Sequence, residues 1–193
     1  MTFDLSSDGY GLLPVTELTP ALLGSFSCGK PRLDEFLSET AVFYHRERLG
    51  FTWVVVHEQC TDVLAYFTLG NDALTLTSSE EADLSLPDYA GLTHFPAVKM
   101  GRLAVATPYQ KTGVSRRVMQ LALDEVRGDQ GLSSAARLVV VDADNDEVVL
   151  RYYERHGFVR SLWADKQAAH QGGKRQHRTT IKMLRDVLVG WGD

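Results

Sequence analysis

Residues 101–128 read GRLAVATPYQKTGVSRRVMQLALDEVRG: an apolar strand-like run, a short polar turn at 110–115 and an amphipathic helix. The small residues of such a turn leave backbone N–H groups facing outward, and the helix that follows adds the partial positive charge of its N-terminus. Lys111, Arg116 and Arg117 raise the local positive charge further. This order of elements predicts a site for the pyrophosphate of a nucleotide-bearing cofactor.

Length and composition indicate one globular domain over residues 1–193. With 44% hydrophobic and 23% charged residues, the chain can form a single core without disulfides or metals. The net charge of -5 argues against a surface committed wholly to nucleic acid. Cys28 and Cys60 are far apart and belong to no cysteine or histidine cluster, so we expect no metal site. No segment approaches the ~18 apolar residues of a membrane span, and we expect a cytoplasmic protein without a membrane partner.

Hydrophobic patterning predicts a mixed α/β domain, in which an antiparallel N-terminal half leads into a strand-helix-strand-helix-strand half. β-Branched and aromatic residues at 51–57 and 63–70 predict a hairpin. The acidic, proline-punctuated stretch 71–97 predicts a surface excursion that could cover a substrate site. We expect further strands at 10–15, 97–105, 136–143, 158–163 and 179–189, a helix that begins near Thr19, and helices at 31–44, 114–128 and 144–157.

The turn at 110–115 becomes specific only together with a second motif. It has neither the GxxxxGK(S/T) pattern of a P-loop nor the GxGxxG pattern of a dinucleotide fold. After the strand at 136–143, the chain continues to YYERHGF at 152–158, in which Tyr153 stands four residues before Gly157. The strand RLAV at 102–105, the turn and this second motif together resemble the GNAT superfamily of acetyl-CoA-dependent N-acetyltransferases.

The resemblance covers residues 97–160 most firmly and implies an architecture. It implies a single GNAT-like domain with a central mixed, mostly antiparallel twisted sheet of six to seven strands, flanked by about four helices. A splayed strand pair is expected to hold the cosubstrate, acetyl-CoA. Two positions depart from the family pattern: Ser115 stands where glycine or alanine is usual, and Asp146 stands where asparagine is frequent.

The resemblance also implies roles for individual residues. Tyr153 is the expected catalytic residue, placed beside the thioester sulfur to protonate the leaving thiolate. The strand at 103–105 would lend backbone groups to the pantetheine arm, and the turn would wrap the pyrophosphate. The expected cofactor-binding residues are Leu103, Ala104, Val105, Gln110, Lys111, Thr112, Gly113, Val114, Ser115 and Arg116.

The chemistry of acetyl transfer suits this arrangement. The attacking amine must lose a proton while the departing thiolate gains one, and a phenol is a suitable short-range donor. A backbone N–H of the strand at 103–105 would stabilise the oxyanion of the tetrahedral intermediate. The acetyl group can then pass directly to the amine, without a covalent enzyme intermediate. Cys28 as an acylated nucleophile is the less favoured route, because no histidine partner is evident. The general base stays open between an ordered water and several side chains, namely His45, Asp72, Glu80, Glu81, His94 and Asp142.

The N-terminal stretch FSCGKPRLDEFL at 26–37 bears on the acceptor. It is similar to the F-x-C-G-x-x-x-L-x-x-F-L pattern of a GNAT subgroup that includes bacterial toxins acetylating aminoacyl-tRNA, which usually work beside an antitoxin. The net charge counts against an RNA substrate, although the basic run at 174–178 could touch cofactor or a polyanion. We therefore expect an N-acetyltransferase acting on a primary amine. The toxin and a non-enzymatic acyl-CoA-binding module are the alternatives, and an antitoxin partner and a homodimer stay open.

Overall fold

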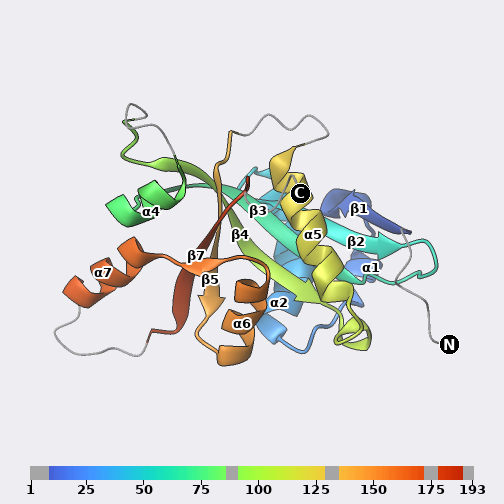
Figure 1. Cartoon of the computed structure of the whole chain (residues 1–193). Helices are drawn as coiled ribbons and strands as arrows, with labels where there is room; N and C mark the ends of the chain where they lie inside the picture. The colour runs from blue at the N-terminus through green and yellow to red at the C-terminus, as the bar shows by residue number, and fades with distance from the viewer. Residues whose placement is uncertain (1–8, 86–90, 129–134, 172–177, 189–193) are drawn as a thin grey trace. The chain divides into compact units, whose positions relative to one another are not determined.

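A computed structural model of the chain describes residues 9–85, 91–128, 135–171 and 178–188. Hydrogen bonding joins seven strands into a sheet in the order β1-β2-β3-β4-β5-β7-β6 (Figure 1). The expected mixed α/β fold with a mostly antiparallel sheet is therefore confirmed. The strands are β1 (Tyr10–Pro14), β2 (Phe51–His57), β3 (Ala65–Leu74), β4 (Phe95–Val105), β5 (Leu138–Asp144), β6 (Val159–Arg160) and β7 (Thr180–Asp186). The helices are α1 (Pro20–Gly24), α2 (Pro31–Glu35), α3 (Ala41–Arg46), α4 (Ser78–Asp83), α5 (Val114–Arg127), α6 (Glu147–Arg155) and α7 (Leu162–Gln171).

Strand register follows the hydrophobic pattern. β1 and β3 both pair with β2 in antiparallel register, which confirms the predicted hairpin of β2 and β3. β4 runs parallel to β5, with Val98 opposite Val139, and β5 pairs with β7 in antiparallel register. The near-continuous apolar run of β5 is buried from Leu138 to Val141, as expected for a strand covered on both faces. The splay of a strand pair around a cosubstrate stays a prediction.

The chain divides into two compact units. The first contains residues 1–70 and 100–124, and the second contains residues 71–99 and 125–193. Tyr66, Phe67, Leu37 and Met119 are fully buried in the first unit. The second unit has its own apolar core, made by Leu74, Leu76, Leu84, Phe95, Ala97, Leu138, Val140 and Leu184.

The expected helix at 31–44 is interrupted. A π-helical turn (Phe36–Thr40) separates α2 from α3, and Thr40, the N-cap of α3, has a φ of -118°. The Ser38 hydroxyl donates to the carbonyl of Asp34 at 3.1 Å, and so competes with the backbone N–H groups for that acceptor. Back-bonding of this kind bends and widens helices.

Two further differences concern the second unit. The expected strand at 158–163 is shorter in the structure, where only the two residues of β6 pair with β7. The chain then turns into α7, and Ser161 caps this helix because its Oγ accepts the N–H of Ala164 at 3.2 Å. The excursion at 71–97 is partly regular, since β3 extends to Leu74 and α4 follows. The described residues thus hold more helices than the four or so expected. The sequence does not predict α4 and α7, because these segments lack strong apolar periodicity.

Candidate functional site

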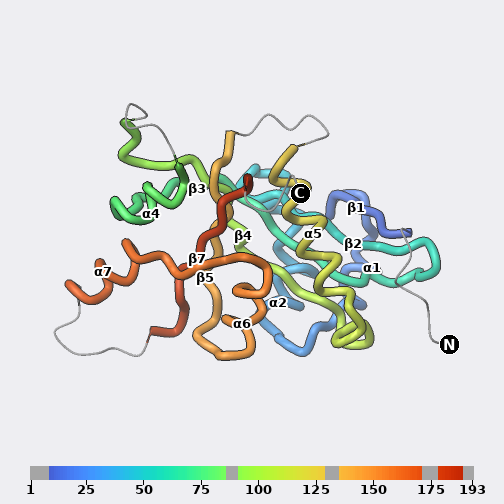
Figure 2. The backbone as a smooth tube through the Cα atoms, in the orientation of Figure 1, coloured from blue at the N-terminus to red at the C-terminus, as the bar shows by residue number. Residues whose placement is uncertain are grey.

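The turn that precedes α5 has the backbone that a phosphate-binding turn needs. The chain leaves β4, makes a 3-10 turn (Thr107–Tyr109) and enters α5 through residues 110–113 (Figure 2). Lys111 and Gly113 have positive φ values of 63° and 94°. The hydroxyl of Thr112 donates to the carbonyl of Tyr109 at 2.6 Å, which fixes the loop. Residues with positive φ in a turn can orient neighbouring backbone N–H groups toward one concave side.

The turn is open beside Gly113. A Cβ added to Gly113 would meet no atom within 4 Å, so the turn is open on that side. Lys111, Thr112 and Arg116 are exposed, whereas Val114 is buried and anchors the helix. The first N–H groups of an α-helix lack intrahelical acceptors and favour an anion. The turn therefore combines an open backbone at Gly113 with exposed cationic side chains, and its role as a diphosphate site stays a prediction.

Gln110 has a different role in the fold from the other residues of the turn. Its amide Nε2 donates to the carbonyls of Cys28 and Val105, both at 2.9 Å. It therefore fastens the turn to the end of β4 and to the loop at 26–30. Thr107 strengthens the same junction, because its backbone N–H donates to the backbone carbonyl of Ser27 at 2.9 Å.

The strand at 103–105 is firmly seated. Ala104 and Val105 are buried, and Leu103 is half-buried. Directly after the strand, the N–H of Ala106 donates to the carbonyl of Leu64 at 2.8 Å. A rigid strand of this kind is suited to present backbone groups to an acyl chain at fixed positions.

Tyr153 lies on α6, in the second unit. Asp146 begins this helix as its N-cap, since its Oδ1 accepts the N–H groups of Val148 and Val149 at 2.9 and 3.2 Å. The Tyr153 ring packs edge-on against Phe158, with ring centroids 5.4 Å apart. Burial, with a smaller contribution from the charge of Asp144, raises the pKa of Tyr153 to about 12. The phenol therefore holds its proton at neutral pH.

Tyr152, the neighbour of Tyr153 on α6, lies in an aromatic contact of its own. Its ring centroid is 4.8 Å from that of His156, and burial raises the pKa of its hydroxyl. The two neighbouring tyrosines provide a matched pair for experiment, because both are half-buried phenols on one helix.

Several expected candidates for the general base have structural partners. Glu80 is buried and caps both α4 and α7, accepting the N–H of Leu162 at 2.8 Å. The Nδ1 of His45 lies 3.2 Å from both the backbone N and the O of Thr52. Burial alone would raise the pKa of Asp142, but a hydrogen bond from Lys99 and the charge of Lys182 outweigh it and lower the pKa.

The remaining candidates lie in more open surroundings. Asp72 accepts the N–H of Ala73 at 2.8 Å, His94 contacts the hydroxyl of Thr93 at 3.1 Å, and Glu81 is exposed. The basic run at 174–178 falls outside the described residues except for Arg178, which pairs with Asp165 at 2.5 Å. The assignment of a general base therefore stays open, and an ordered water is a sufficient proton relay.

The stretch at 26–37 contains a loop at 26–30 followed by α2, and Asp34 of the helix closes the loop. The carboxylate of Asp34 accepts the N–H of Cys28 at 2.8 Å and the hydroxyl of Ser27 at 3.1 Å. Burial, followed by the hydrogen bond with Asp34, raises the pKa of Cys28 to about 11. A thiol of this kind is a poor nucleophile at neutral pH, which disfavours the covalent route.

Arg102 is a residue whose role sequence reasoning missed. Its guanidinium carbon lies 3.5 Å from the ring centroid of Phe36, a close cation–π contact in the first unit. Sixty-six positions of sequence separate these residues, so no local pattern could have paired them. The only signal was a charged residue inside an otherwise apolar strand pattern.

The family comparison agrees with the geometry. The model of the acetyltransferase (GNAT) family matches residues 26–158, and the chain belongs to this family. It is therefore an acyltransferase whose acyl donor is acetyl-CoA. No curated protein matches the sequence. Among the described residues, no group of three or more His, Cys, Asp or Glu side chains could hold a metal ion, and no helix is long and apolar enough to cross a membrane.

Solved structures with this fold are numerous. A tyrosine-to-phenylalanine mutant of KacT has 18% identity and a TM-score of 0.68, over 93% of this chain and 96% of that one. AtaT complexed with acetyl-methionyl-tRNAfMet has 20% identity and a TM-score of 0.67, over 90% and 93%. A mutant AtaT toxin bound to the C-terminus of the antitoxin AtaR and acetyl-CoA has 19% identity and a TM-score of 0.64, over 93% and 94%.

Proposed function

We propose that the chain, acting as one domain over residues 1–193, moves an acetyl group from acetyl-CoA directly to a primary amine, with Tyr153 as general acid. The open, positively charged turn at Gly113 is the observation that carries this proposal. The passage of β3, β4 and α5 from one compact unit into the other supports a single domain.

Each group has a defined task in this mechanism. The N–H groups of the turn and the exposed Lys111 and Arg116 bind the diphosphate. A backbone N–H in the strand at 103–105 stabilises the oxyanion that forms when the amine attacks the acetyl carbonyl. Tyr153 gives its proton to the departing thiolate as the carbon–sulfur bond breaks, and a water takes the proton that the amine loses. The products are the acetylated amine and coenzyme A.

For the acceptor, we propose the amine of an aminoacyl-tRNA. The similar AtaT structure holds acetyl-methionyl-tRNAfMet, and the N-terminal pattern at 26–37 points to the same subgroup. An antitoxin partner follows from the same likeness, and a homodimer is compatible with it. The cytoplasm is the expected location, because charged tRNA and acetyl-CoA are present there.

A screen of acetyl-CoA turnover tests the proposal. The purified chain is incubated with radiolabelled acetyl-CoA and, separately, charged tRNA, polyamines, free amino acids or peptide N-termini. Label transferred to charged tRNA, together with growth arrest on expression, supports the toxin function. Transfer only to small amines would leave the acetyltransferase and refute the RNA acceptor. Binding of acetyl-CoA without turnover on any acceptor would favour the acyl-CoA-binding module.

A further inference from the structure

The side chain of Arg102 lies on an aromatic platform. Its Cζ is 3.5 Å from the ring centroid of Phe36 and 5.6 Å from that of Tyr44. Phe36 in turn packs edge-on against Tyr44, with centroids 5.5 Å apart, and stacks on Tyr66 at 6.2 Å. Arginine stacked flat on a ring keeps its planar fork of N–H donors available at the edge.

This platform is rigid. Phe36 is 5% exposed and Tyr66 is fully buried. The Tyr66 hydroxyl donates to the carbonyl of Leu33 at 2.8 Å, which ties β3 to α2. The π-helical turn begins at Phe36, which is the residue whose ring contacts Arg102. Arg102 is therefore held in one orientation by side chains that cannot easily move.

The side chain of Arg102 has no acidic partner among the described residues. It makes no ion pair and no hydrogen bond there, whereas Arg137 pairs with Asp186 at 2.7 Å and Arg178 pairs with Asp165. Its side chain is half-buried rather than fully solvated. A fixed guanidinium of this kind, without a carboxylate, is suited to bind an external anion with two parallel hydrogen bonds.

The position of Arg102 relates this anion site to the reaction. Arg102 directly precedes Leu103 in β4, where the proposed acyl-binding strand begins. Because successive side chains of a strand point to opposite faces, the Arg102 side chain leaves the strand on the face opposite to Leu103. An anionic group of the acceptor bound by Arg102 would lie alongside the backbone groups proposed to hold the acyl chain. In an aminoacyl-tRNA the carboxyl group of the amino acid is an uncharged ester, and the nearest anion is the phosphodiester of the terminal nucleotide.

We propose that Arg102, held over the ring of Phe36 and beside Tyr44, binds the phosphate nearest the reactive amine of the acceptor. This inference rests on the proposed aminoacyl-tRNA function and adds the group that recognises the RNA end. A free amino acid would offer a carboxylate to the same guanidinium, and the two sources are separated by experiment.

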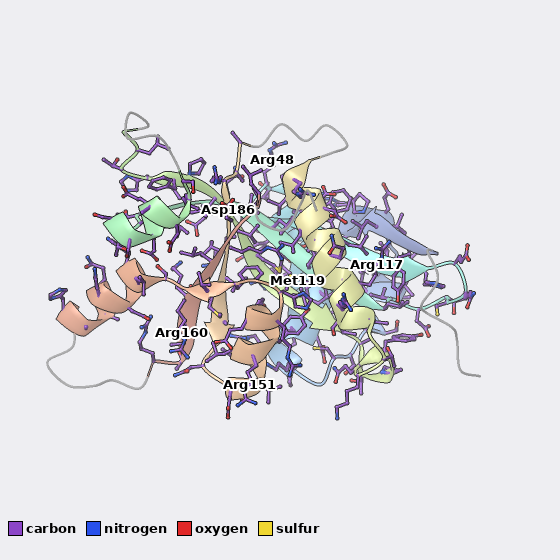
Figure 3. All side chains as sticks on the ribbon, viewed as in Figure 1. Arg48, Arg117, Met119, Arg151, Arg160 and Asp186 are labelled. Carbon is purple, nitrogen blue, oxygen red and sulfur yellow. The ribbon has the colours of Figure 1, made fainter. Side chains whose placement is uncertain are left out.

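The test compares Arg102→Gln and Arg102→Lys with Arg48→Gln. Arg48 is the matched control, because its Cζ lies 5.4 Å from the ring of Phe51 and its removal causes the same charge change (Figure 3). The acceptors are charged tRNA, an aminoacyl-cytidylyl-adenosine dinucleotide with one phosphate, an aminoacyl-adenosine without phosphate, and the free amino acid. Thermal melting and the KM for acetyl-CoA are recorded for each variant to establish that it folds and binds the donor.

We expect Arg102→Gln to raise the KM for charged tRNA and for the dinucleotide by about 10- to 100-fold. The KM for aminoacyl-adenosine should change less than about threefold, and Arg102→Lys should recover only part of the loss. Equal effects of Arg102→Gln and Arg48→Gln would overturn the inference, as would an equal loss on the phosphate-free acceptor. A loss confined to the free amino acid would assign the site to a carboxylate instead. If the unaltered protein acetylates no aminoacyl acceptor, the proposed function itself fails, and the inference fails with it.

Discussion

Glu80 holds the N-terminus of a helix far along the chain: its Oε1 accepts the N–H of Leu162, the first residue of α7, at 2.8 Å across 82 positions of sequence. Its Oε2 accepts the N–H of Trp163 at 3.2 Å and the N–H of Thr77 at 2.7 Å. One buried carboxylate thus caps α4 and α7 together. A charged residue that had been a candidate general base is committed to the fold of the second unit.

Glu80→Gln should destabilise the protein. A glutamine amide presents one oxygen and one NH2 group, so one set of backbone donors loses its acceptor. We expect the free energy of unfolding to fall by about 1–3 kcal/mol and Tm by roughly 2–10 °C. Glu81→Gln is the control, because Glu81 is the next residue, is exposed and loses the same charge. Equal melting temperatures for the two variants would contradict the double-cap role.

Tyr153→Phe should lower kcat by about 10²- to 10⁴-fold while the KM for acetyl-CoA changes little, because the phenyl ring keeps the packing but cannot donate a proton. Tyr152→Phe on the same helix should retain most activity. Turnover of acetyl-CoA, followed by release of the free thiol, measures both. Wild-type kcat in Tyr153→Phe would remove the general-acid role.

The pH dependence of the same pair follows from the raised pKa of Tyr153. A general acid works in its protonated form, which for a pKa of about 12 persists far into the alkaline range. The ratio of wild-type to Tyr153→Phe activity should therefore stay constant between about pH 6 and pH 10. A ratio that falls toward 1 with a midpoint near neutral pH would show that Tyr153 loses its proton there, and would contradict the raised pKa.

Gly113→Ala should weaken binding of acetyl-CoA. The φ of 94° strains any side chain, and the added methyl group would enter the open side of the turn. We expect the KM for acetyl-CoA to rise by about tenfold or more. Acetyl-pantetheine, which lacks the pyrophosphate, is the control donor, and its turnover should be unchanged. A similar loss with both donors would mean that Gly113 acts on folding rather than on the diphosphate.

Cys28 should be unreactive at mildly alkaline pH. With a pKa of about 11, roughly one thiol in a thousand is ionised at pH 8, so alkylation should be about 100-fold slower than for a thiol at the ordinary value of 9.0. Iodoacetamide labelling of a Cys60→Ala protein isolates this thiol. Asp34→Asn should increase the rate, because it removes a negative charge beside the sulfur. Cys28→Ala that loses acetyl transfer while melting normally would reopen the covalent route.

Much of the fold was predictable because its signals are local. The alternating and β-branched residues of 51–57 form β2 with the same bounds, and Thr19 caps α1 by accepting the N–H of Leu22 at 3.3 Å. The glycines that end α5 and α6, Gly128 and Gly157, have the positive φ expected of C-caps. The Thr77–Glu80 capping box likewise follows from a local T-x-x-E pattern.

The positive φ of Gly113 and the end of α6 at Gly157 are determined by neighbours a few residues away, so the sequence could predict the turn at 110–115 and the helix that carries Tyr153. Contacts across long separations could not be found in this way. The stacking of Arg102 on Phe36, the double cap made by Glu80 and the raised pKa values of Tyr153 and Cys28 all depend on which distant segments exclude water from a side chain. The sequence by itself therefore determined the elements and the residues that could serve acetyl transfer, whereas the tertiary structure decided which charged groups are committed to the fold and which can meet a substrate.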